Sequence, residues 1–209
     1  AHLKDAALVL RLVTQTSGSA GRDDFLSASE MAVFVERLIA GVEVRAARVA
    51  AFRPGPEAGC EAEAVLEDIR WCTATLGELD VTLEMQPGSA WGKDVRESRL
   101  KVARRLTETI RSAPKVVEAG LPMTRTTLAG RMTRKVPDLN SDPASPALAT
   151  AAVQLRMLGA LRSAAAVFGC ESDRKRQADT LVETLSRYAD EAFDLINGGE
   201  AEDLDRALA

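Results

Sequence analysis

Hydrophobic positions recur every three or four residues along most of the chain, which predicts amphipathic helices. The clearest run lies at about 57–86, where apolar residues are spaced four, three, four, three and four: Val65, Ile69, Cys72, Leu76, Leu79 and Leu83. This spacing is the heptad seam of coiled-coil packing. A helix of about 30 residues is about 45 Å long, so we expect an elongated molecule.

Start and stop signals place the other helices. A helix is expected at 3–14, although the apolar run within it would also suit a short strand. The next is expected from about residue 28, where Ser27 and Glu30 form a capping box, to the break at 53–56. A fourth is expected from about Ala90, with Pro114 as a kink or a new turn, to Gly120.

Two further helices follow. Ser145 as a cap and Pro146 at the first helical position predict a helix that ends at Phe168, before Gly169. A last long helix is expected over about 172–196, with a second heptad seam, and the dipeptide after it is read as its stop. A short acidic helix can follow that stop.

The segment 123–144 lacks this periodicity. It is basic and rich in threonine, and we expect it to be irregular, with room for one short helix. The sequence thus predicts a single domain over 1–209 of the all-α class: an elongated antiparallel helical bundle with long heptad-patterned helices.

The amino-acid composition restricts the classes of binding partner that we expect. Aromatic residues make up only 4% of the chain, which argues against an aromatic-lined ligand pocket. The net charge of −4 disfavours a protein devoted to nucleic acid, because phosphate contacts dominate such binding. No apolar stretch is long enough for a membrane span. Protein partners or surface neighbours are therefore expected rather than a small molecule.

Charge is segregated along the chain. The stretch 57–84 has a net charge of −7, the stretch 91–135 has +8, and the residues from Glu171 onward have −6. Oppositely charged helices lying side by side would explain this pattern. The sharper hypothesis is an anion or partner site on the basic segment, formed by Arg125, Arg131, Arg134 and Lys135.

Three cysteines bear on the compartment. Cys72 lies on the heptad seam and is expected to be a small buried core residue. Cys60 and Cys170 both lie near helix ends, so they would form a disulfide if those ends meet, which would imply an oxidising compartment. The odd count is typical of a chain whose thiols stay reduced, and both alternatives are open.

Catalytic chemistry is sparse. The one histidine, His2, lies at the amino terminus, so histidine acid-base catalysis and a Ser-His triad are not expected. Carboxylate pairs at helical spacing occur at Glu63 with Glu67 and at Glu191 with Asp194, and solvated faces explain them better than a metal centre. No phosphate-binding glycine motif and no N-glycosylation sequon occurs. We expect no enzyme activity, cofactor or metal.

The alanine- and glutamate-rich helices, and the run EAEAVLED at 61–68 in particular, resemble the helical surface coat proteins of trypanosomes of the glutamic acid/alanine-rich type. The resemblance implies an elongated bundle held to the plasma membrane by a lipid anchor added to a carboxyl-terminal segment. It carries no individual residue role.

Three functional hypotheses follow. The first is a non-enzymatic surface coat or spacer protein outside the cell, lipid-anchored in its full-length form. The second is an intracellular adaptor or chaperone that binds partners through the basic loop 124–135. The third, which the pattern supports least, is a carboxylate-based bundle enzyme or metal binder.

Overall fold

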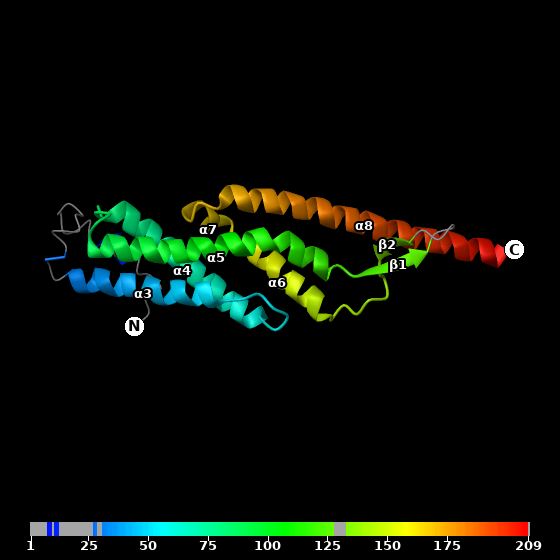
Figure 1. Ribbon diagram of the computed structural model, residues 1–209, viewed down its shortest axis with the longest axis horizontal. Helices are drawn as coiled ribbons and strands as arrows, with labels where there is room; N and C mark the ends of the chain where they lie inside the picture. The colour runs from blue at the N-terminus through cyan, green and yellow to red at the C-terminus, as the bar shows by residue number, and fades with distance from the viewer. Residues whose placement is uncertain (1–7, 10, 13–26, 29–30, 128–132, 209) are drawn as a thin grey trace.

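The computed structural model describes residues 8, 9, 11, 12, 27, 28, 31–127 and 133–208, except for the side chains of 127 and 198–208. These residues are mostly helical, as the all-α prediction required, and they include one small two-stranded sheet. The helices lie roughly along one long axis and give the molecule an elongated outline (Figure 1). No helix within the described ranges is long and apolar enough to cross a membrane.

The first two long helices are α3 (Ala32–Ala51) and α4 (Gly59–Thr82), separated by the predicted break. Helix α3 begins about four residues later than predicted, with Met31 at its N-cap. Ser27 lies in a turn before the helix, and Glu30, its predicted partner, lies outside the described residues. All six residues of the predicted α4 seam are buried. Most of the expected helix at 3–14 also lies outside the described residues.

Helix α5 (Ala90–Gly120) is the central helix and packs against α3, α6 and α8. Its start and end agree with the prediction, and the Ser89 side chain caps it by accepting a hydrogen bond from the N–H of Gly92. Pro114 lies inside the helix, where it cannot donate to the carbonyl one turn before it. The helix nonetheless continues to Gly120.

Two antiparallel strands follow, β1 (Met123–Thr127) and β2 (Thr133–Pro137). The prediction of an irregular segment or a short helix here was wrong for these residues. Threonine is β-branched and favours extended backbone, and five residues separate the strands, which suits a hairpin loop.

The predicted helix 146–168 is divided into α6 (Pro146–Ala160) and α7 (Arg162–Val167). Its cap and its end agree with the prediction. The Ser145 hydroxyl accepts from the N–H of Leu148, and Gly169 adopts a φ of 69°. The N–H groups of Gly169 and Cys170 bond to the carbonyls of Ala166 and Ala165, which satisfies the last turn of α7.

Helix α8 (Glu171–Leu208) packs against α5 and α7, runs in the same direction as α5, and extends past the body beside the hairpin (Figure 1). The predicted stop at Asn197 was wrong, because the helix continues through both glycines that follow. The hydrophobic core is formed by the faces that α3–α7 turn toward one another, with Leu181 as the buried contribution of α8.

Candidate functional site

The basic hairpin β1–β2 is the candidate site, and its strand register decides which side chains share a face. Arg125 lies directly opposite Lys135, and Thr126 lies opposite Arg134. Since side chains alternate between the two faces of a strand, Arg125 and Lys135 project to one face while Arg134 projects to the other. The predicted cluster is therefore split into a basic pair and a single arginine. Arg131 lies outside the described residues.

The Arg134 face of the hairpin is directed toward helix α8. The Arg134 guanidinium lies 3.7 Å from a carboxylate oxygen of Glu191, and β2 packs against α8. Glu191 belongs to one of the carboxylate pairs noted in the sequence. In the structure this carboxylate lies beside the hairpin and faces Arg134. Arg134 thus helps to hold the hairpin in place.

The Arg125–Lys135 face is exposed. Both side chains are accessible to solvent, and neither makes an ion pair with a side chain that the structure describes. Two like charges directly opposite each other in an antiparallel pair repel, so this arrangement weakens the hairpin. An anionic group bound between them would remove the repulsion. We define Arg125 and Lys135 as the basic pair.

The base of the hairpin is tied to both helices that flank it. The Pro122 carbonyl, just after α5, accepts hydrogen bonds from the Asp138 N–H at 3.0 Å and from the Tyr188 hydroxyl of α8 at 3.1 Å. Burial, followed by the charge of Asp138, raises the pKa of Tyr188 above its ordinary value, so its hydroxyl stays protonated as a donor at neutral pH. These two hydrogen bonds therefore fix the base of the hairpin that carries the basic pair.

A second polar cluster lies between α3 and α4. The buried carboxylate of Asp68 accepts two hydrogen bonds from Arg48, at 2.8 and 2.6 Å, and lies 3.5 Å from Arg45. The Arg45 guanidinium also lies 4.0 Å from the centre of the Trp71 ring. The Arg48 side chain is 58% exposed, and with Arg45 it neutralises the buried acid and joins two helices, so the cluster has a structural role.

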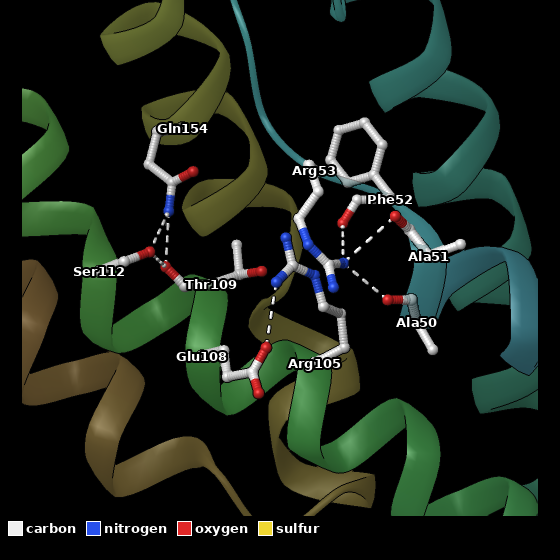
Figure 2. Close-up of polar contacts among 9 residues, drawn as sticks. All are labelled: Ala50, Ala51, Phe52, Arg53, Arg105, Glu108, Thr109, Ser112 and Gln154. Atoms are coloured by element: carbon white, nitrogen blue, oxygen red, sulfur yellow. Dashed lines mark hydrogen bonds and ion pairs between the residues drawn. The ribbon is translucent and has the colours of Figure 1, made fainter.

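Figure 2 shows a third polar cluster, where α3, α5 and α6 meet. Gln154 of α6 is fully buried and donates to the Thr109 carbonyl of α5 at 2.5 Å. Arg53 donates to the carbonyls of Ala50 and Phe52 at the end of α3, where a helix leaves such groups unpaired. Arg105 of α5 is bonded to Glu108 of the same helix. These contacts satisfy helix ends and join neighbouring helices, so they have a structural role. The hairpin is therefore the better candidate for a functional site.

The cysteines are all free thiols. Cys60 is exposed, whereas Cys72 and Cys170 are buried, and of the two alternatives left open for Cys60 and Cys170 the structure has the free thiols and not the disulfide. Cys72 occupies the core position expected for it. Burial raises the pKa of the Cys72 thiol to about 12, and burial also raises the pKa of Cys170.

These environments predict the thiol reactivity of the native protein. At pH 8 we expect one equivalent of Ellman's reagent to react within minutes, at Cys60, since the other two thiols are shielded and protonated. A Cys60→Ser variant should lose this fast phase, and a Cys72→Ser variant should keep it. Rapid reaction of all three thiols without denaturant would contradict the prediction.

The carboxylates expected to be solvated are exposed at Glu63 and Glu67, and Glu63 lies 3.5 Å from Arg156 of α6. No group of three potential metal ligands comes together among the residues that the structure describes. At the far end of the molecule, a groove of about 380 Å³ lies where α4 turns into α5, and it includes an ion pair between Asp80 and Arg99 at 2.6 Å. Because both acidic and basic residues line this groove, it favours neither an anionic nor a cationic ligand.

No protein-family model, curated protein or solved structure shows a significant similarity to this chain.

Proposed function

We propose that the protein is a non-catalytic binding protein in which an antiparallel bundle of heptad-patterned helices holds the basic pair at one end. There, Arg125 and Lys135 bind an acidic segment of a partner protein. The observation that supports this most is the exposed cross-strand pair of like charges, to which no described side chain supplies a neutralising acid. This is the adaptor hypothesis, with its site reduced from the loop to one face of a hairpin.

The charges around the hairpin favour a short acidic segment over nucleic acid. The neighbouring half of α8 carries Asp190, Glu191 and Asp194, and the whole chain has a net charge of −4. A continuous polyanion extends well beyond two residues and would also experience the negative charge of this part of the molecule, and repulsion between like charges would weaken its binding. A peptide with two or three acids can contact the pair alone.

Reversal of the basic pair tests this function. The probe is a fluorescent peptide of about 12 residues that contains three adjacent glutamates, followed by anisotropy at low salt. We expect the Arg125→Glu/Lys135→Glu variant to bind it about 30-fold more weakly, which corresponds to about 2 kcal/mol. The variant retains two like charges across the strands, so its stability should match that of the native protein.

A matched control separates the site from general charge. Arg104→Glu/Lys115→Glu makes the same change in net charge at two exposed bases of α5, and it should leave the dissociation constant within about twofold. Equal weakening in both variants would overturn the proposal. So would an unlabelled polyphosphate or oligonucleotide that competes better than the glutamate peptide.

A surface coat or spacer protein is the second candidate, and the elongated outline in Figure 1 favours it. The free, exposed thiol of Cys60 favours the first candidate, because reduced thiols persist in reducing compartments. Labelling of intact source cells with a membrane-impermeant biotin reagent tests the coat proposal. Strong labelling of the protein would support it, and labelling only after lysis would overturn it.

A further inference from the structure

Helix α8 carries an exposed apolar stripe that no described part of the chain covers. The stripe consists of Val182, Ala189, Phe193 and Ile196, with exposed fractions of 64% for Val182, 64% for Phe193 and 50% for Ile196. The spacing of seven, four and three residues places them on one side of the helix, over about four turns. We call these four residues the α8 stripe.

The stripe is distinct from the side of α8 that packs on the body. Leu181 is buried, and Leu185 and Tyr188 are partly buried, so these residues form the inner face. Glu191, which contacts the hairpin, follows Val182 by nine residues, or about two and a half turns, and so lies on the opposite side of the helix. The α8 stripe therefore faces away from the hairpin, and both surfaces are accessible together.

A row of acids borders the stripe. Asp179, Glu183, Asp190 and Asp194 are exposed, follow one another at intervals of four, seven and four residues, and make no ion pair with any described residue. At about 100° per residue, this row lies immediately beside the α8 stripe on its outer side. Arg187 is the only base between Asp179 and Ile196. We call these four carboxylates the acidic row.

We infer that the α8 stripe and the acidic row form a docking face for a basic amphipathic helix of a partner protein. Apolar residues of that helix would cover Val182, Phe193 and Ile196, and lysines or arginines along one edge would pair with the acidic row. This is the usual way in which one amphipathic helix recognises another, with apolar anchors giving affinity and edge charges giving orientation.

The charge of the acidic row favours one class of binding partner for this face over the others. In a second copy of the chain packed through the same surface, acids would meet acids, and like charges across an interface are costly. An anionic lipid surface would be repelled for the same reason. A partner helix with basic edges is attracted along the whole row.

The test uses a synthetic peptide of about 18 residues, made of leucine and lysine in an amphipathic helical pattern, with full-length protein. Two controls replace each lysine with glutamate or scramble the order. By calorimetry we expect the lysine peptide to bind one to one and at least about 10-fold more tightly than either control.

Variants of both parts of the face should weaken that binding by about 10-fold each: Val182→Ser/Phe193→Ser for the stripe and Asp190→Lys/Asp194→Lys for the row. Matched changes at exposed residues of α3, Val44→Ser and Glu36→Lys/Glu43→Lys, should leave it unchanged. The native helical content, measured by circular dichroism, should be retained in all of them.

Three results would overturn the inference. The first is equal binding of the lysine and glutamate peptides, and the second is a loss in the α3 variants as large as that in the α8 variants. The third is a protein that sediments as a dimer and becomes a monomer in Val182→Ser/Phe193→Ser, because this would assign the face to a second copy. None of these results bears on the basic pair, whose own test uses an acidic peptide.

Discussion

Replacement of Leu76 by alanine is expected to lower the free energy of unfolding by about 3 kcal/mol, within the range of about 2 to 5 for buried leucines. Leu76 is 0% exposed and lies in the middle of the α4 seam, where the side chains of the surrounding helices close around it. The shorter side chain would leave a cavity that packed helices fill only in part. Chemical denaturation followed by circular dichroism measures the change.

Val81 of the same helix provides the control. Its side chain is 82% exposed, and Val81→Ala should change the free energy of unfolding by less than about 0.5 kcal/mol. The comparison isolates burial from helix propensity, because both substitutions place alanine in α4. A loss below about 1 kcal/mol for Leu76→Ala, or equal losses in the two variants, would show that the seam is not part of the core.

A second large loss of stability is expected from a substitution at the close contact between α5 and α6. A Cβ atom added at Gly120 would lie 2.5 Å from the Cβ of Ala151 and 2.8 Å from the Ala147 carbonyl oxygen. Gly120→Val must therefore push the two helices apart, and we expect a loss of about 2 kcal/mol in the free energy of unfolding. Thermal denaturation by calorimetry gives the value, with a lower melting temperature as the direct sign.

Gly159 is the matched glycine. It lies in α6, and a Cβ added there meets no atom within 4 Å. Gly159→Ala should raise the free energy of unfolding by up to about 1 kcal/mol, because alanine is the better helix former. If Gly120→Ala also stabilised the protein, the close approach of α5 and α6 would be refuted.

Local signals in the sequence predicted several helix ends correctly. Ser145 and Gly169 act through bonds to groups within a few residues, so their effects can be read without knowledge of the fold. The stop expected at Asn197 was wrong, although it belongs to the same class of signal. Residues 200–208 that follow are mostly good helix formers, and a glycine within a helix costs only about 1 kcal/mol.

The hairpin could not be predicted in the same way. Its five-residue strands show no alternation of apolar and polar residues, so the periodicity that marks a half-buried strand is absent. The run of threonines was the available signal, because β-branched residues favour strands. Sequence reasoning grouped Arg125, Arg134 and Lys135 into one site, and all three are exposed in the structure. It could not separate Arg134 from the other two, since that separation depends on the strand register.

Long-range ion pairs were missed for a similar reason. Arg48 lies on the helix edge where a charge is ordinarily solvated, and only the packing of α4 against α3 brings it to Asp68. An acid that shares a helix face with apolar positions, as Asp68 does with Val65 three residues before it and Cys72 four residues after it, was the sign that a base from another helix would be needed.

The Pro122 carbonyl has a further consequence. It accepts from Tyr188 on one side and from Asp138 at the foot of β2 on the other, and Arg134 and Glu191 make a second link a few residues away. These hydrogen bonds and this ion pair thus connect the hairpin that carries the basic pair to the helix that carries the α8 stripe. Thermodynamic linkage then requires reciprocity: if an acidic ligand on the hairpin changes the affinity of α8 for a helix, that helix changes the affinity for the ligand by the same factor.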